Sequence, residues 1–541
     1  MLRLAGTACA VVSLTASLLA AEPPSIDALF PAGVQRGESV SVDLIGKPGD
    51  SPLHVWTDRP ELTVEPATDS ATVTVTAAAE APPGVYWIRL ANEAGAASLR
   101  PFVVGTLPEV WEVEANDSAD VAQTIDPAGT VVNGVLSESA DVDTFLVPLL
   151  TGQTLVASLD ADRTLASPMD GVLQVVSPQG FVLQQNDDDH GIDPQIAFTA
   201  PADGTYAVRL FAFPKQPNSS IGFSSAKTYV YRLTLTTGPF ADRAAPLTND
   251  PAGAYRLLGW NIAETQELVP SRDGDRLTAP LPIPGTWEFD RLPFMPDPVQ
   301  TETDPAADTL PLPVPGAMWG SLEQPGDVDV YTFAATSGAK LSLAVAARAL
   351  GSPLDPVLRI LNADNKVLDT ADDSGGGVFD PATTFSPPAD GEYRIEISDR
   401  FGFGGPRFFY VLTATPERPD FTIQLDQDAY LLHPGDPLEI KLKLARTGGM
   451  QDPVTLKIEG LPEGVTATLT APEPDESGAW IVPNGTNEAT LKLEAAEGTT
   501  SSAPLSISAA TGESPRQSAT APLIRLPFRT PHLWLTVAPK P

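Results

Sequence analysis

Two stretches of nearly the same sequence lie 187 residues apart: PADGTYAVRL at 201–210 and PADGEYRIEI at 388–397. In the second stretch, Tyr393, Ile395 and Ile397 alternate with charged residues. This period of two is typical of a β-strand with one buried face. The Asp-Gly pair before it predicts the turn from which the strand starts. The two stretches therefore predict that one β element is used twice.

The similarity extends along the chain in the same order. GVLSESADVDTFLVPLLTGQTL, from Gly134, matches GSLEQPGDVDVYTFAATSGAKL, from Gly320. SPMDGVLQVVSPQGFVL, from Ser167, matches SPLDPVLRILNADNKVL, from Ser352. Shared β composition would explain alternation but not identities that keep their order and spacing. The sequence thus contains an internal duplication.

The composition indicates the fold class. The 541 residues include 56 prolines and 42 glycines, and 42% are hydrophobic. Proline and glycine interrupt helices, so this mixture favours many short strands joined by turns. We expect an all-β protein, a tandem array of antiparallel β-sandwiches. The formal net charge of −36 disfavours nucleic acid as a partner and attracts cations.

The first 21 residues resemble a signal peptide, with Arg3 before a run of apolar and small residues. The single cysteine, Cys9, lies within this segment, so the mature chain can form no disulfide. No later apolar run approaches the roughly 20 residues that a membrane helix needs. We therefore expect an exported protein without a transmembrane segment, in the periplasm, on the cell surface or outside the cell.

The repeats resemble bacterial pre-peptidase C-terminal (PPC) domains. The resemblance rests on EVEANDSADVA (112–122), DVDTF (141–145), NDDDHGIDP (186–194) and the PADGTYAVRL strand. The second copy departs from it at TETDPAAD (301–308), where Asp304 replaces Asn116. The family implies jelly-roll-like β-sandwiches, usually appended to secreted proteases and other exported enzymes. It also implies roles in secretion and substrate adhesion and, in some members, calcium binding.

The remaining segments complete a domain plan. Residues 22–106 resemble an immunoglobulin-like module of the IPT type, and the C-terminal segment resembles other immunoglobulin-like modules of bacterial surface proteins. The predicted plan is a signal peptide (1–21), an Ig-like domain (22–106), a first PPC-like domain (107–240), a short β unit with a proline-rich connector (241–300), a second PPC-like domain (301–416) and a C-terminal Ig-like domain (417–541).

Acidic residues in the PPC-like motifs are candidate calcium ligands, because Ca²⁺ takes six to eight oxygen ligands. In the first copy the resemblance implicates Glu112, Glu114, Asn116, Asp117, Asp141 and Asp143. In the second copy the matching residues are Glu302, Asp304, Asp327 and Asp329, a poorer set. The alternative is that these acids cap turns and face solvent.

Two further clusters of residues are candidates for a cation site or a binding surface. Asp187, Asp188, Asp189 and Asp193 predict a charged loop or a loose cation site, and we expect the neighbouring His190 at the surface. Aromatic residues follow the PADG strand in both copies: Phe211, Phe213, Phe401 and Phe403. We favour the interpretation that they complete the sandwich core. The alternative is an aromatic surface that grips a peptide or a glycan.

The sequence offers little for catalysis. Its four histidines form no H-E-x-x-H pair, no G-x-S-x-G motif occurs, and the mature chain has no cysteine. The leading hypothesis is a non-catalytic, exported binding or scaffold protein, stabilised by calcium, that adheres to an extracellular or envelope protein or polysaccharide. The alternatives are an accessory component of a secreted peptidase system, a cryptic hydrolase, or a spacer without a ligand.

Overall fold

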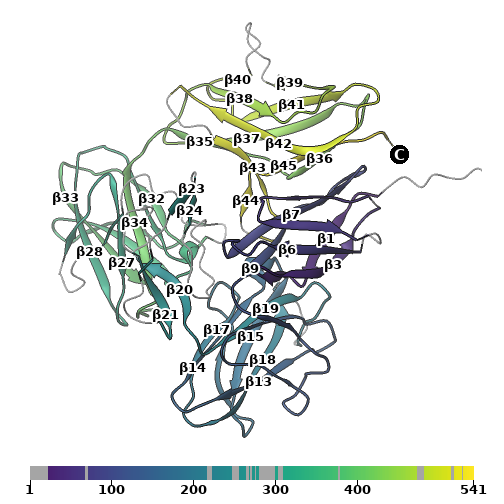
Figure 1. Ribbon diagram of the computed structural model, residues 1–541. Coiled ribbons are helices and arrows are strands. Elements are labelled where there is room, and N and C mark those ends of the chain that lie inside the picture. Colours follow the sequence, from purple (N-terminus) through teal and green to yellow (C-terminus); the bar gives the residue numbers. More distant parts are fainter. Residues whose placement is uncertain are drawn as a thin grey trace, which may run out of the picture.

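The computed structural model describes residues 22–50, 52–67, 71–215, 222–245, 255–262, 267–268, 271–273, 276–278, 299–301, 309–375, 378–471, 480–512, 517–526 and 528–540. Within these ranges the fold is nearly all β, with sheets grouped into several domains (Figure 1). The helices there are two short turns, α1 (Asp162–Leu165) and η2 (Arg348–Leu350), and neither is long enough to cross a membrane. The predicted fold class is confirmed.

The N-terminal unit is a sandwich of two sheets. One has the order β1-β3-β6-β5, and the other has the order β2-β9-β7-β4 with β8 added to β7. Val40, Val42 and Leu44 face the core, as their alternation predicts. The strands are β1 (Ser25–Phe30), β2 (Gly33–Gln35), β3 (Ser39–Lys47), β4 (His54–Thr57), β5 (Leu62–Pro66), β6 (Thr72–Ala77), β7 (Gly84–Asn92), β8 (Gly95–Ala96) and β9 (Arg100–Gly105).

The first repeat forms two five-stranded sheets. Their orders are β10-β12-β19-β14-β17 and β11-β13-β18-β15-β16. The strands are β10 (Glu109–Trp111), β11 (Gln123–Thr124), β12 (Thr130–Val135), β13 (Asp143–Leu149), β14 (Thr154–Asp160), β15 (Met169–Val176), β16 (Val182–Asn186), β17 (Gln195–Thr199), β18 (Gly204–Pro214) and β19 (Val230–Thr236).

The second repeat has the same topology. Its sheets have the orders β25-β27-β34-β29-β32 and β26-β28-β33-β30-β31, which match the first repeat strand for strand. The strands are β25 (Val299–Thr301), β26 (Leu310–Pro311), β27 (Gly316–Ser321), β28 (Val328–Ala335), β29 (Leu341–Ala346), β30 (Pro356–Asn362), β31 (Val367–Ala371), β32 (Ala382–Phe385), β33 (Gly391–Asp399) and β34 (Phe409–Pro416). The internal duplication is therefore a duplication of fold.

The repeated PADG-x-Y motif locks a strand to its neighbours. In the first copy, Asp203 Oδ1 accepts hydrogen bonds of 2.7 Å from both the amide and the hydroxyl of Thr151, in the loop between β13 and β14. The Tyr206 hydroxyl donates to the Ala202 carbonyl at 2.8 Å. In the second copy the tyrosine of the motif makes the same bond, to Ala389 at 2.7 Å. The motif therefore fixes where β18 and β33 begin.

Between the repeats lie a three-stranded sheet and a hairpin. The sheet has the order β20 (Phe240–Ala245), β21 (Tyr255–Trp260) and β22 (Glu267–Leu268). The hairpin joins β23 (Ser271–Asp273) to β24 (Arg276–Thr278). Most of the predicted proline-rich connector falls outside the described residues.

The C-terminal unit is built from one eleven-stranded sheet that folds around a single apolar core. Its main path is β36-β45-β42-β43-β35-β37-β41-β39, with β38, β40 and β44 attached beside it. The strands are β35 (Asp420–Gln424), β36 (Ala429–Leu432), β37 (Leu438–Thr447), β38 (Val454–Glu459), β39 (Val465–Ala471), β40 (Ile481–Val482), β41 (Glu488–Ala495), β42 (Ser501–Ala510), β43 (Gln517–Pro522), β44 (Arg529–Thr530) and β45 (Leu533–Val537).

The first and last units touch, so the array closes on itself (Figure 1). Arg89, on β7, is 1% exposed, and its Nη2 donates to Asp428 Oδ2 at 2.8 Å and to the His532 carbonyl at 2.9 Å. A cavity of about 350 Å³ lies beside this pair, and Trp56 and Trp534 are among its lining residues. A buried charge pair thus joins two units that are far apart in sequence.

We predict that Asp428→Ala destabilises the closed arrangement by about 3–5 kcal/mol, because it leaves the Arg89 guanidinium buried without its counter-charge. Differential scanning calorimetry of the full chain measures the effect. The control is Asp436→Ala, which removes a partly exposed partner of Lys540 and should cost less than about 1 kcal/mol. Equal losses in the two variants would contradict the prediction.

Candidate metal centre

Carboxylates from two separate segments of the first repeat converge beside β13. Glu112 and Glu114 follow β10, which pairs in parallel with β12. Asp143 is the first residue of β13. One oxygen from each of these three side chains lies within 4.8 Å of the others. The arrangement places three oxygen ligands where one cation could contact all of them.

A buried tyrosine links two of these carboxylates. The Tyr231 hydroxyl, on β19, lies 2.7 Å from Glu112 Oε2 and 2.5 Å from Asp143 Oδ2. The Val135 amide donates to Glu112 Oε1 at 2.7 Å. Gly134, on β12, leaves room for this contact, because a Cβ atom there would overlap both the tyrosine hydroxyl and the glutamate. The residues that support the carboxylates, Tyr231 and Gly134, are therefore part of the sheet itself.

Several buried polar atoms at this place have no hydrogen-bond partner within the described residues. They are both side-chain amide atoms of Asn116, Asp143 Oδ1 and the Thr144 hydroxyl. Asn116 is fully buried, and its main-chain carbonyl accepts a 3.0 Å hydrogen bond from the Thr144 amide, which holds it against β13. Buried polar atoms almost always have partners. A bound cation would supply the missing partner for the side-chain oxygen of Asn116 and for Asp143 Oδ1.

The electrostatics of the cluster also favour a cation. Burial, followed by the charge of the nearby Glu112 carboxylate, raises the pKa of Asp143 to about 10. Burial likewise raises the pKa of Glu112. For Glu114, burial and then the charges of Asp141 and Glu112 raise the pKa. Without a cation, Asp143 therefore retains a proton at neutral pH, and a cation would bind in competition with that proton.

The other predicted ligands of the first copy lie near this cluster but differ in exposure. Asp141 is buried and accepts a 3.0 Å hydrogen bond from the Glu138 amide. Asp117 is exposed. The structure thus brings together Glu112, Glu114 and Asp143, places Asp141 close by, and leaves Asp117 at the surface. All of these donors are oxygens, which suits a hard cation such as Ca²⁺.

The second copy has a different, more neutral arrangement. Asp329 occupies the position of Asp143, since each pairs with the matching residue of the PADG strand. The Tyr410 hydroxyl donates to Asp329 Oδ2 at 2.5 Å and lies 2.6 Å from the Tyr331 hydroxyl. In the first copy, Glu112 is the second partner of the tyrosine. A hydroxyl group therefore takes the place that a carboxylate has in the first copy.

The other predicted calcium ligands of the second copy are not seen to converge on Asp329. Asp327 accepts hydrogen bonds from the Glu323 and Val328 amides, at 2.9 Å and 3.0 Å, and so supports a turn. Glu302 and Asp304 lie outside the described residues.

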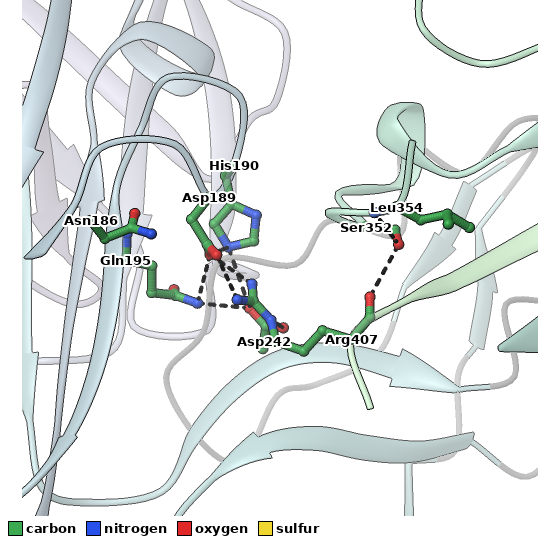
Figure 2. A network of polar contacts seen from close by, with 8 residues as sticks. All are labelled: Asn186, Asp189, His190, Gln195, Asp242, Ser352, Leu354 and Arg407. Carbon is green, nitrogen blue, oxygen red and sulfur yellow. Dashed lines mark hydrogen bonds and ion pairs between the residues drawn. The ribbon is translucent and has the colours of Figure 1, made fainter. Parts of the chain in front are cut away.

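The second acidic cluster lies where the two repeats meet (Figure 2). Arg407 donates from both Nη atoms to Asp189, each at 2.6 Å, and from Nε to Asp242 at 3.1 Å. Gln195 Nε2 donates to the same two carboxylates at 3.3 Å and 3.0 Å. His190 Nε2 lies 3.5 Å and 3.3 Å from them. Here a guanidinium group supplies the positive charge, so the cluster is a junction between the repeats.

This junction corrects one expectation. His190 was expected at the surface, but it is 8% exposed, because the second repeat covers it near Gly351. Asp193 has a structural role: it accepts hydrogen bonds from three successive amides at the start of α1. In the second copy Asp380 accepts hydrogen bonds from two successive amides at the start of η2, so the shared acid is a cap.

The sequence analysis favours the interpretation that the aromatic residues after the PADG strand complete the core. The structure contradicts this interpretation for three of the four residues. Phe211 is buried, but Phe213, Phe401 and Phe403 are 37%, 66% and 58% exposed. In the first copy the Phe211 ring lies 4.5 Å from that of Phe223, which is itself 40% exposed. Phe213 lies on the outer face of β18, and Phe401 and Phe403 lie in the loop after β33, so both copies present aromatic surface.

Sequence reasoning missed several residues of these sites. Tyr231 and Tyr410 occupy matching positions in the final strands of the two copies, so the repeat itself could have identified them. No repeated motif identifies Asp242 and Arg407. They come together only through the packing of the two repeats.

We predict a pH-dependent stability from Asp329. Burial raises its folded-state pKa to about 7, above its ordinary value of 3.8. Between these values the folded state binds the extra proton, so stability falls as pH rises through this interval. In EDTA at pH 8, Asp329→Asn should therefore have a higher melting temperature than the wild type and a free energy of unfolding that is larger by on the order of 2 kcal/mol. This difference should vanish near pH 4.

Melting curves measured at both pH values check this expectation. The control is Tyr331→Phe, which alters the same buried group without removing a carboxyl. A constant difference between Asp329→Asn and the wild type at both pH values would show that the carboxyl is not held protonated.

Comparisons with known proteins bear on one repeat directly. The model of the bacterial pre-peptidase C-terminal domain matches residues 327–399. A probable subtilase-type serine protease of Deinococcus radiodurans is 26% identical over 202 residues. This match covers 37% of the present chain and 23% of the protease, so the chain spans less than a quarter of that relative.

Three solved structures show some similarity to parts of this chain. The pre-peptidase C-terminal domain of a Bacillus anthracis collagenase is 16% identical, with 20% of this chain and 94% of that domain covered and a TM-score of 0.17. Domains 4 and 5 of the S-layer protein SbsC are 15% identical, with 31% and 76% covered and a TM-score of 0.15. An alpha-2-macroglobulin of Escherichia coli is 9% identical, with 94% and 46% covered and a TM-score of 0.16. From the family match, this all-β, multi-domain chain carries a pre-peptidase C-terminal domain at residues 327–399.

Proposed function

We propose that the protein is a non-catalytic, exported scaffold that binds an extracellular or envelope polymer or protein, and that calcium stabilises its first repeat. In this proposal the first repeat is a second PPC domain, and the first and last units are Ig-like modules. The matching strand orders of the two repeats support the former assignment. Export is consistent with the occurrence of PPC domains in secreted bacterial proteins.

One observation carries this proposal: the carboxylate cluster and the aromatic surface of the first repeat share their supporting residues. Val142 lies between Asp141 and Asp143 and packs against Phe211 and Val172. A cation held by the carboxylates would fix the start of β13, and with it the packing beneath the exposed rings. Calcium would thus order a binding surface without taking part in a reaction.

The duplication gives this surface a second, metal-independent counterpart. Phe401 and Phe403 lie 6.3 Å apart between ring centroids and are well exposed. Aromatic faces bind sugars and peptide side chains through large contact areas at low entropic cost. Two weak sites on one chain gain avidity when they reach the same polymer.

The second candidate function is an accessory role in a secreted peptidase system. The resemblance of 202 residues to part of a probable subtilase-type protease favours it. In this view the chain would bind a substrate or a protease rather than cleave a peptide bond. A peptidase activity that survives purification and is lost on a single substitution would replace both candidates with an enzyme.

We predict that calcium raises the melting temperature of the chain from residue 22 onward, in the transition of the first repeat. A ligand at 100 times its Kd stabilises the folded state by about 2.7 kcal/mol. Asp143→Asn should abolish the calcium effect, and the matched substitution Asp329→Asn in the second repeat should retain it. Binding should also release a proton from Asp143, so the calcium affinity should increase with pH.

Calorimetry in EDTA and after addition of calcium measures the shift, and titrations in buffers of different ionisation enthalpy count the proton. No shift in the wild type would reduce the cluster to a proton-holding structural element. Retention on envelope polysaccharide, compared between the wild type and Phe401→Ala with Phe403→Ala, tests the binding surface independently.

A further inference from the structure

Each repeat ends one of its sheets in an edge strand, β16 in the first and β31 in the second, and the edge of the first repeat is the more apolar. β16 is the last strand of its sheet, and the side chains from Phe181, directly before the strand, through Gln185 are exposed. Phe181, Val182 and Leu183 are 69%, 49% and 45% exposed. Exposed edges of this kind invite pairing with another strand, and proteins usually guard them with charge or proline.

The second repeat shows how such an edge is guarded. Its edge strand β31 has the same register as β16, since Val367 pairs with Leu361 as Val182 pairs with Val176. By this register the position of Phe181 is taken by Lys366, a cation that disfavours pairing. The duplicated edges therefore differ in the very feature that controls strand addition.

A second replacement leaves the acids at the first edge without a direct ion pair among the residues that the structure describes. In the second repeat, Arg400 Nη1 lies 2.8 Å from Asp372 and 3.9 Å from Asp373, directly after β31. In the first repeat the register places Phe213 where Arg400 stands. The matching acids, Asp187 and Asp188, are exposed and form no ion pair among the residues that the structure describes.

Like charges gather around these acids. Burial raises the pKa of Asp170, which pairs with Phe213, and the charges of Asp188 and Asp187 raise it further. Burial, followed by the charge of Asp187, also raises the pKa of Asp188, while Arg348 of the second repeat opposes the shift. The edge thus combines an apolar start with an acidic end.

We propose that the free edge of β16 binds an extended segment of a partner protein that carries lysine or arginine, which adds to the sheet as a further strand. Backbone hydrogen bonds of the edge would supply affinity, as in other cases of strand addition. Phe181, Val182 and Leu183 would contact apolar side chains of the segment, and Asp187 and Asp188 would contact its cations. This inference deepens the proposed scaffold function, on which it rests, by naming a partner class.

The test uses the chain from residue 22 onward and three fluorescein-labelled ten-residue peptides. One alternates lysine and valine, one alternates lysine and proline, and one alternates glutamate and valine. We expect fluorescence anisotropy to show binding of the lysine–valine peptide alone, because proline lacks the amide that pairs with an edge. Hydrogen–deuterium exchange should slow in the fragment covering 181–189 when this peptide binds.

Variants that copy the second repeat onto the first locate the site. Phe181→Lys with Phe213→Arg should weaken peptide binding at least tenfold, which is about 1.4 kcal/mol. Lys366→Ala, on the matching edge, should leave binding unchanged. Both changes concern exposed side chains, and circular dichroism confirms that the variants are folded.

Three results would overturn the inference. These are equal binding of the lysine–proline peptide, full binding by the double variant, and no binding of any peptide. Self-association of the wild type that the double variant abolishes, seen by light scattering, would also overturn it and assign the edge to a second copy of the chain. Retention on envelope polysaccharide is measured in parallel, so that a failure of this inference can be told from a failure of the scaffold function.

Discussion

The structure of each repeat depends on the turn that starts its central strand. The aspartate of PADG-x-Y accepts amide hydrogen bonds from the loop opposite, and the tyrosine bonds back to the turn. Because side chains of a strand alternate between faces, this starting point decides which face of the sheet each later side chain of β18 and β33 occupies. It sets Leu210 opposite Asp143, and it sends Phe211 and Phe213 to the outer face. A slip of one residue would exchange the core for the surface.

Much of this fold could be predicted because its signals are local. Alternation identified the buried faces of β3 and β33, and ordered identities identified two copies of one unit. Ligand candidates such as Glu112, Glu114 and Asp143 could be named because they belong to motifs. The exposure of Phe401 could not be predicted, because an aromatic residue after a strand is compatible with either face. The burial of His190 depends on a second repeat packing over it, which no local pattern encodes.

The two copies illustrate how little must change for a shared fold to take on different chemistry. Phe145 in the first copy corresponds to Tyr331 in the second, and the added hydroxyl reaches the tyrosine of the last strand. In the first copy that tyrosine meets Glu112 and Asp143, which would carry two negative charges if both were ionised. A neutral chain of hydrogen bonds satisfies its own polar groups, whereas a pair of carboxylates requires a proton or a cation. The sheets around both sites keep the same order.

Closure of the array changes how it would carry a mechanical load. In a linear string of domains, tension applied to the ends passes through each domain in turn. Here the N-terminal and C-terminal units are joined directly by the Arg89–Asp428 pair, so force between them is borne first at this contact. The two repeats lie between these units in the sequence, and the first repeat packs against both of them through apolar side chains. If the protein tethers two bodies through its terminal units, tension reaches the repeats only after the Arg89–Asp428 pair and the apolar contacts around it have separated, and their separation would lengthen the tether by the chain between the two units.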